Sequence, residues 1–318
     1  KKLLFSDKTG RVHWVAVADG KFQTIDKSDY GDIGDYGWSG DSRWVCYSKP
    51  TAAGFGQIHL YSIDTRKTTA VTEGLTDDYS PTFDPDGKYL FFASRRTFQP
   101  EFGAFELNIH FSATDKLYAM ALRDSIGSPV GPESDEETGA GDDEKGGDKG
   151  DKADKGGKDS KAAKPAAPAL RIDLANMAAR TVELPVETGR YRGLTAVKGK
   201  LVWLAMDEPA ADDEGGGASA SIHFFDFEKR EDKVALQGVD PGYSLSKDGS
   251  KVLYTKGDVY GITDLAEGKK VGDGKIATGQ LMAWVDPRLE WRQMFDEAWR
   301  LERDFYYDPA MGRLDRKA

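Results

Sequence analysis

The chain of 318 residues contains a single cysteine, Cys46, and only four histidines. One cysteine cannot form a disulfide within the chain, and its place in a strand-like run predicts a small buried residue rather than a nucleophile. The HExxH, GxSxG, CxxC and P-loop patterns are also absent, because Gly272–Lys275 lacks the glycine spacing and the Ser or Thr of a phosphate loop. We therefore expect no catalytic residue, no metal ligand and no cofactor-binding residue in this chain.

Long apolar runs and an excess of basic charge are absent as well. No run approaches the length that crosses a membrane, and no secretory signal opens the chain. The formal net charge is −10, whereas a nucleic-acid-binding surface needs positive charge. We expect neither a membrane nor nucleic acid as a partner. The abrupt start suggests a piece of a longer protein, located in the cytoplasm or, since a leader would be missing here, in the periplasm.

A repeated unit of two apolar runs joined by a tight turn organises the sequence. Its clearest copy is Tyr79–Ser94, YSPTFDPDGKYLFFAS, in which Pro85 presets the turn and Gly87 tolerates a positive φ. The continuous apolar run after the turn is typical of a strand that is buried on both faces. Further copies lie at Tyr36–Ser48, at Tyr243–Thr255 and, in weaker form, at Tyr191–Ala205.

Two of these copies continue into a third and a fourth strand-like run. The third is Gln57–Ile63 or Ser221–Phe227, and the fourth is Lys67–Thr72 or Lys233–Gln237. Four strands that recur about every 45–50 residues are the signature of propeller blades. The sequence therefore predicts an all-β fold, a β-propeller of about four to five blades from a larger ring. Residues 1–25 are expected to form a blade that lacks its first strand.

One blade of this series is interrupted. Residues 95–115 form an aromatic insertion, and residues 131–168 consist mainly of Gly, Asp, Glu, Lys, Ala and Pro. We expect residues 131–168 to be disordered, because they cannot bury enough apolar surface to offset the entropy of ordering. A calcium-loop interpretation is weaker, since the carboxylates lack the spacing and closing Glu of an EF-hand. Arg171–Leu174 and Arg180–Leu184 are expected to complete the interrupted blade.

The apolar period changes after Asp286. Apolar side chains then recur at helical spacing, and Pro309 ends the pattern; the face consists of Trp291, Met294, Phe295, Ala298, Trp299 and Phe305. The sequence therefore predicts two parts. Residues 1–286 form a β-propeller fragment, and residues 287–318 form the first helix of a following domain.

Several polar groups are candidates for binding, each with an alternative. Arg95 and Arg96 follow a strand end and could pair with the carboxylate of an acidic peptide terminus. The favoured alternative is an ion-paired or solvated position at a blade edge. The acid pairs Asp77-Asp78 and Asp212-Asp213 are expected to be exposed in turns.

Two further sets of residues recur with the repeat. His59 and His223 occupy equivalent positions in third strands, which predicts a packing role rather than a ligand or base. The tyrosines that begin each copy are candidates to face the axial opening of the ring. The favoured alternative is that each one packs between neighbouring blades. These residues are Tyr36, Tyr79, Tyr191 and Tyr243.

Three stretches together resemble the tricorn protease family, which are serine peptidases of the S41 type. They are Phe91–Pro100 followed by Phe105–Leu107, Leu117–Arg123 before Ser128–Val130, and, most specifically, Pro287–Arg300 continued by Arg303–Pro309. The resemblance covers essentially the whole chain and implies the C-terminal part of the second propeller plus the first helix of the catalytic core. One departure is that residues 312–317 lack the His-Gly and Asp-Trp pattern of the family.

The resemblance implies that the parent protein is a hydrolase that cleaves peptides. The propeller would act as a channel or sieve that admits peptides to a serine active site, beside the remaining domains in a homo-oligomer. The family's catalytic serine, histidine and glutamate follow this helix, so the resemblance assigns no catalytic role to any residue here. The alternative is a non-enzymatic TolB-like or WD40-like propeller that binds protein partners.

Overall fold

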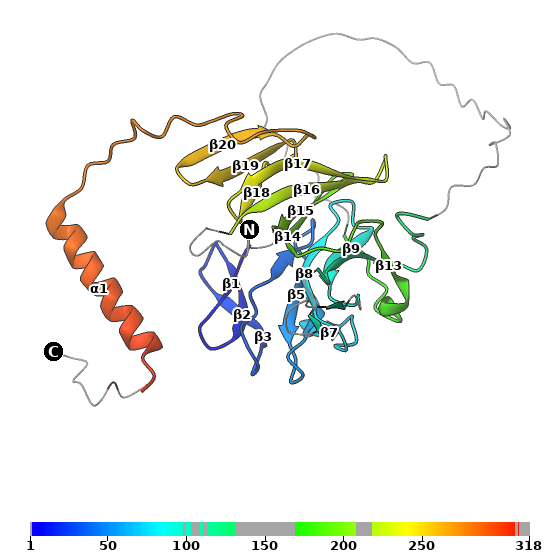
Figure 1. Cartoon of the computed structure of the whole chain (residues 1–318). Coiled ribbons are helices and arrows are strands. Elements are labelled where there is room, and N and C mark those ends of the chain that lie inside the picture. Colours follow the sequence, from blue (N-terminus) through cyan, green and yellow to red (C-terminus); the bar gives the residue numbers. More distant parts are fainter. Residues whose placement is uncertain are drawn as a thin grey trace, which may run out of the picture. The chain divides into compact units, whose positions relative to one another are not determined.

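The structure is a computed structural model that describes residues 2–97, 100–102, 109–110, 113–131, 169–207, 218–308 and 311. It divides into two compact units, residues 1–276 and 277–318. The first unit contains five antiparallel blade sheets (Figure 1) and, in addition, a separate two-stranded ribbon. This architecture is the β-propeller that the sequence predicts.

The blades follow one another in chain order. Blade 1 contains β1 (Lys2–Ser6), β2 (Arg11–Ala16) and β3 (Phe22–Lys27). Blade 2 contains β4 (Tyr36–Trp38), β5 (Trp44–Pro50), β6 (Gly56–Ser62) and β7 (Lys67–Ala70). Blade 3 contains β8 (Asp78–Phe83), β9 (Tyr89–Ser94), β12 (Lys116–Ala121) and β13 (Thr181–Glu183). Blade 4 contains β14 (Tyr191–Val197), β15 (Lys200–Met206), β16 (Ala220–Asp226) and β17 (Glu231–Val239), and blade 5 contains β18 (Tyr243–Leu245), β19 (Lys251–Lys256) and β20 (Val259–Asp264).

The repeat seen in the sequence becomes the first two strands of a blade. In blade 3, β8 pairs with β9 across the predicted turn, and Gly87 at φ 68° supplies its left-handed residue. The run after the turn is buried on both faces, since Leu90 to Ala93 are at most 2% exposed. Phe92 and Phe91 alternate between the two faces, and each belongs to a different apolar cluster.

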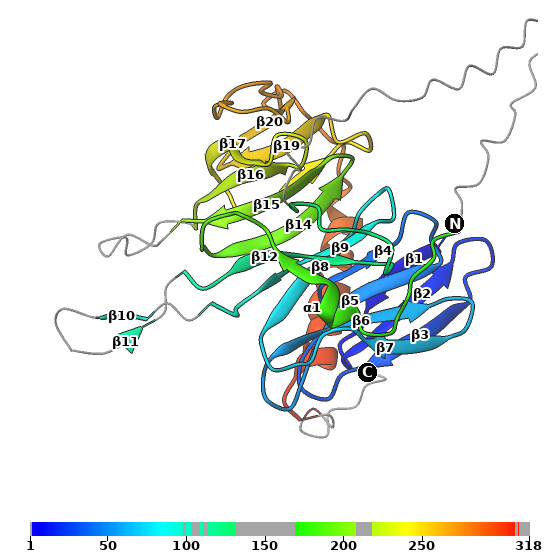
Figure 2. The same cartoon turned by 90° about the vertical axis from the view of Figure 1, so that its right-hand side faces the viewer.

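The interrupted blade closes as predicted, with one difference. β13 pairs with β12, although residues 132–168, which lie outside the described residues, separate these strands in the sequence. Arg171–Leu174 forms no strand, and the chain passes through a short 3₁₀ helix, Met177–Arg180, before it enters β13. The earlier insertion contains the ribbon of β10 (Glu101–Phe102) and β11 (Ile109–His110), which is seen in Figure 2.

The apolar core is divided among the junctions between blades. Each of four clusters joins two consecutive blades. The cluster between blades 3 and 4, for example, brings Phe91 and Leu117 together with Leu201 and Trp203. Blades 2, 3 and 4 are therefore covered on both faces, which explains why each of their second strands contains a run of consecutive buried apolar residues; these runs are 45–47, 90–93 and 201–204.

The second unit contains the helix α1 (Pro287–Phe305). Asp286 caps it by accepting a hydrogen bond from the Arg288 amide at 3.0 Å, and Pro287 occupies the first turn. The apolar side chains at helical spacing are exposed within the described residues, with Trp291 at 64% and Phe295 at 71%, except that Trp299 is partly buried. None of the helices in the described part of the chain is long and apolar enough to span a membrane.

Candidate functional site

The tyrosines at the start of the inner strands hold neighbouring blades together. The Tyr79 hydroxyl donates to the Tyr191 carbonyl of blade 4 at 3.1 Å. The Tyr243 hydroxyl donates to the carbonyls of Gly193 and Val202, also in blade 4, at 2.6 and 3.1 Å. Packing between blades, the favoured alternative from the sequence, is therefore confirmed for Tyr79 and Tyr243.

Burial keeps these phenols in the donor form. It raises the pKa of Tyr79, and the nearby Asp115 carboxylate adds to the effect. Burial likewise raises the pKa of Tyr243 and of Tyr191. Tyr191 differs in its contacts, because its hydroxyl donates at 2.6 Å to the Glu187 carbonyl just before its own blade.

Arg95 joins three segments at one end of blade 3. Its Nη1 atom lies 2.7 Å from Asp77 Oδ2, and its Nε atom lies 3.1 Å from Asp115 Oδ1. The guanidinium also lies over the Tyr79 ring, 5.1 Å from the ring centre. Asp115 in turn accepts a hydrogen bond from the Tyr191 amide at 2.8 Å, so the same group of charges reaches blade 4.

Arg96 pairs with a carboxylate inside the blade. Its Nη2 atom donates to both oxygens of Asp78, at 3.2 and 3.1 Å. Asp78 is fully buried and also accepts hydrogen bonds from the hydroxyls of Thr76 and Ser94. The guanidinium of Arg96 covers the Tyr118 ring at 4.9 Å. Both arginines therefore occupy ion pairs, as the favoured alternative predicts.

The expectation that Asp77 and Asp78 are exposed in a turn is wrong for Asp78. This residue begins β8 and is 0% exposed, because Arg96, Ser94 and Thr76 supply the partners that its charge requires. The second pair, Asp212-Asp213, lies outside the described residues.

The histidines belong to an aromatic pair that recurs in the blades. His59 on β6 stacks on Tyr47 on β5, with ring centres 5.4 Å apart. His223 on β16 lies against Trp203 on β15 at 5.6 Å, in the equivalent place. The predicted packing role of both histidines is confirmed. His110 lies in β11, where the side chains are outside the described part of the structure.

A third histidine makes a polar link that the sequence did not reveal. The Nε2 atom of His13 lies 2.9 Å from Asp7 Oδ2, and its Nδ1 atom lies 3.1 Å from the Thr24 hydroxyl. The imidazole is 4% exposed and lies between Phe5 and Phe22. This chain of carboxylate, imidazole and hydroxyl connects the turn between β1 and β2 with β2 and β3. A signal for it existed, since His13 occupies the same third-strand position as His59.

Neither Cys46 nor the acidic groups of the described residues provide a nucleophile or a metal site. Burial raises the pKa of the Cys46 thiol to about 12, and the thiol lies 3.4 Å from the Pro81 carbonyl of the next blade. The predicted small buried residue is confirmed. Among the described residues, no three His, Cys, Asp or Glu side chains lie close enough together to hold a metal ion.

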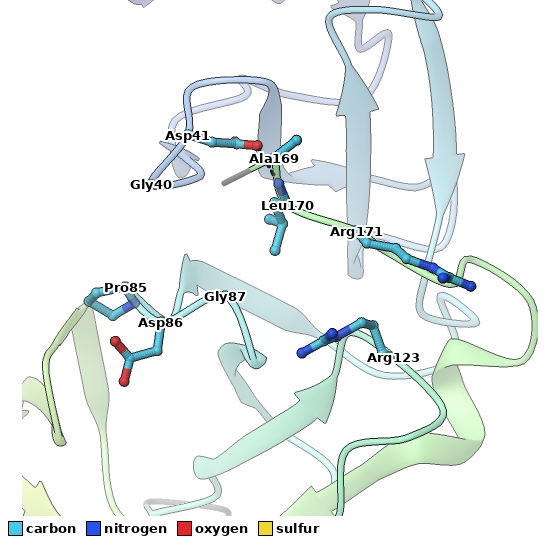
Figure 3. Close-up of a pocket in the computed structure, with 9 residues that line it drawn as sticks. All are labelled: Gly40, Asp41, Pro85, Asp86, Gly87, Arg123, Ala169, Leu170 and Arg171. Carbon is cyan, nitrogen blue, oxygen red and sulfur yellow. Dashed lines mark hydrogen bonds between the residues drawn. The ribbon is translucent and has the colours of Figure 1, made fainter. Parts of the chain in front are cut away.

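A surface pocket of about 300 Å³ lies between the turns of blades 2 and 3 (Figure 3). The Leu170 amide enters it and donates to Asp41 Oδ2 at 2.6 Å. Partial burial acts to raise the pKa of Asp41, but hydrogen bonds from Ser39, Leu170 and Arg43 hold it below its usual value. Arg123 and Asp86 line the same pocket. Because both signs of charge are present, the pocket favours no single ligand class.

Consecutive antiparallel blade sheets of this topology define a β-propeller protein. The described residues include no assembled catalytic centre. Residues 1–266 match the family model described as the tricorn protease second beta propeller domain. Residues 287–318 match the model described as the tricorn protease C1 domain. The chain belongs to the tricorn protease family and is a propeller portion of a tricorn-type protease.

Known relatives agree with this assignment. The chain is 30% identical to tricorn protease homolog 1 of Streptomyces coelicolor, over 96% of this chain and 28% of that protein. It is 25% identical to the tricorn protease of Thermoplasma volcanium, over 97% of this chain and 28% of that protein. It also superposes on a crystal structure of the tricorn protease with a TM-score of 0.77 and 23% identity, over 98% of this chain and 28% of that one. The chain thus spans little more than a quarter of these relatives.

Proposed function

We propose that the protein containing this chain is a serine peptidase of the tricorn type, and that the chain forms part of the channel through which peptides reach the active site. The observation that carries this proposal is the order of the two family matches. A tricorn propeller model covers residues 1–266, and a tricorn C1 model follows directly at residues 287–318. The catalytic residues would lie outside this chain.

The geometry of the inner strands supports a sieve of fixed width. β4 contacts β8, and β8 contacts β14, so the inner strands of consecutive blades lie side by side. The hydrogen bonds of Tyr79 and Tyr243 to blade 4 hold the spacing of these strands. An opening bounded by strands at fixed spacing admits an extended peptide and excludes a folded protein.

The remaining domains of the parent protein, and further copies of it, are the proposed partners of this chain. The relatives are more than three times as long as the matched region, because the match covers 28% of tricorn protease homolog 1. The exposed apolar side chains of α1, such as Trp291 and Phe295, require a partner surface to bury them.

Hydrolysis of fluorogenic peptides of graded length tests the proposal. We expect the full-length protein to cleave short peptides and this chain alone to cleave none. A tryptophan at the exposed inner-strand residue Ser244 should lower kcat/KM for long peptides more than for short ones. A tryptophan at Lys67, which is exposed on the outer strand β7, is the matched control. It should leave kcat/KM unchanged for both long and short peptides.

Two outcomes would count against the proposal. If the full-length protein cleaves no peptide in the series, the peptidase assignment fails. If Ser244→Trp and Lys67→Trp behave alike in an active protein, the propeller is not the route by which peptides enter.

A further inference from the structure

Blade 3 obtains its fourth strand from a part of the chain that returns after residues 132–168. We call residues 169–186 the return segment. It begins in the pocket between the turns of blades 2 and 3, passes through the 3₁₀ helix and enters β13. Its contacts with the blades are distributed along its whole length.

The first contact anchors the return segment to two blades at once. The Leu170 amide donates to Asp41 of blade 2 at 2.6 Å (Figure 3). The Leu170 side chain lies against Gly87 of blade 3 so closely that a Cβ atom at residue 87 would be 2.7 Å from Leu170 Cδ1. Ile172 continues this contact into the apolar cluster between the same two blades.

The middle of the return segment is held by backbone hydrogen bonds and one arginine. The Asp173 amide donates to the Leu122 carbonyl at 2.8 Å. Arg180 donates to the Ala121 carbonyl at 3.0 Å and to the Asp173 carbonyl, and it also pairs with the Asp124 carboxylate. Between these contacts Met177 is 2% exposed.

The end of the return segment is fixed in the same manner. The Leu184 amide donates to the Leu117 carbonyl at 2.8 Å, and the Leu184 side chain is fully buried. Lys116 donates to the Val186 carbonyl at 2.7 Å. The chain that leaves blade 3 is also held, because the Tyr89 hydroxyl donates to the Gly127 carbonyl at 2.8 Å.

From these contacts we infer that blade 3 binds the return segment as a docked peptide, so that the chain can be cut between Gly131 and Ala169 and remain one folded body. Each contact between the return segment and the blades before it joins residues on opposite sides of the cut, and none uses residues 132–168. The second piece would also carry blades 4 and 5, and the apolar cluster that joins blade 4 to blade 3 includes Leu201 and Trp203. A two-chain form, cut once between these residues, would therefore keep the fold of the single chain.

A recognition sequence for a site-specific protease, inserted between Gly150 and Asp151 of the full chain, tests this inference. The folded protein is cut, and the uncut protein with the same insertion is the control. We expect the pieces to elute together in size-exclusion chromatography. Hydrogen exchange at the amides of Asp173 and Leu184 should change by less than about threefold on cutting. Separation of the pieces, or loss of protection at these two amides alone, would overturn the inference.

A pair of variants shows whether the return segment itself is docked. In the cut protein, Arg180→Ala should speed exchange at Asp173 and Leu184 by at least about tenfold, because it removes bonds to both sides of the cut. Arg171→Ala is the matched control, since that side chain is 79% exposed, and it should leave exchange unchanged. If Arg180→Ala does not fold before cutting, Leu170→Ala replaces it. Equal exchange in the cut variant and its control would overturn the inference.

Discussion

Asp78 lies inside blade 3 with a fully buried carboxyl group. The stability of blade 3 therefore depends on the side chains that pair with this carboxylate. Arg96 supplies the opposite charge, while Ser94 and Thr76 donate from their hydroxyls. Removal of one partner from a buried ion pair is costly, because it leaves an uncompensated charge away from water. Arg95, on the same end of the blade, has a side chain that is 44% exposed.

We expect Arg96→Ala to lower the free energy of unfolding by about 3 kcal/mol, as a broken buried ion pair does. Arg95→Ala should cost about 1 kcal/mol or less, because the Arg95 side chain is 44% exposed and the buried Asp115 keeps its hydrogen bond from the Tyr191 amide. Urea denaturation of the two variants measures both values. Equal losses for the two arginines would contradict the account that the fully buried Asp78 depends on its arginine more strongly than Asp115 does.

His59 makes the stability of blade 2 depend on pH. Burial lowers its pKa from 6.5; Asp26 opposes this effect, and Lys49 adds to it. Its Nδ1 atom finds no hydrogen-bond partner among the described residues. The folded state therefore binds a proton less readily than the unfolded chain. The contribution of His59 to stability is complete above pH 6.5 and is lost as the pH falls toward its lowered pKa.

The variant His59→Phe keeps the stacking on Tyr47 and removes the titrating group. We expect its melting temperature to exceed that of the wild type by a margin that grows as the pH falls from about 7 to about 5. Thermal melts at a series of pH values measure this margin. A constant difference across the range would show that His59 is not the group that titrates.

At the scale of the element, blade 5 replaces its outer strand by a glycine-rich crossing. The segment 272–276 crosses β20, where the Ile262 amide donates to the Gly274 carbonyl at 3.0 Å. The Gly272 amide donates to the Tyr254 hydroxyl at 2.8 Å. Gly274 adopts φ 64°, and a Cβ atom there would lie 1.8 Å from the Ile262 carbonyl oxygen. The sequence showed these glycines only as an incomplete phosphate loop, and their role is close backbone packing.

We expect Gly274→Ala to destabilise the chain by about 3 kcal/mol, because backbone strain adds to a clash that no side chain can relieve. Gly268→Ala is the control, since Gly268 also has a positive φ, of 75°, but a Cβ atom there would have no neighbour within 4 Å. It should cost about 1 kcal/mol. Chemical denaturation compares the two, and equal costs would show that strain alone, without the clash, limits this position.

The sequence was sufficient to predict the elements whose partners are close in the chain. Tyr79–Ser94 predicted a turn and a doubly buried strand, because both depend on local turn chemistry and on a continuous apolar run. The burial of Asp78 was not predictable in the same way, since its partner Arg96 follows after a strand. The return segment was only partly predictable. Its strand β13 follows from its pattern, whereas the contact of Leu170 with Asp41 depends on two distant turns.

For the molecule as a whole, stability resides in the junctions between blades. Blade 3 carries apolar clusters on both faces, whereas blades 1 and 5 of this chain each take part in one cluster. Proteins whose units contact only their neighbours open from the units with the fewest contacts.

We therefore expect amide exchange to be slowest in β9 and β12, and at least about tenfold faster in β1 and β20. Hydrogen-exchange mass spectrometry of the chain measures this order. Uniform protection across the five blades would show that the first unit opens as one cooperative body and not blade by blade.

The aromatic pair described for His59 and His223 extends through the repeat. Blade 1 lacks a first strand, so its β1 occupies the place of the second strand in the other blades. In all five blades the fourth residue of this strand is aromatic, and in four blades a planar side chain of the next strand faces it; the pairs are Phe5 with His13, Tyr47 with His59, Phe92 with Tyr118, and Trp203 with His223. In blade 5 the aromatic residue faces Gly261. The position between these two strands thus requires a planar side chain, and the rings of Tyr, Trp, Phe and His all meet this requirement. Duplicated blades can then diverge until no residue is shared, while the slot between their strands persists. An alignment scored on side-chain planarity would detect the common ancestry of such blades after residue identity has decayed.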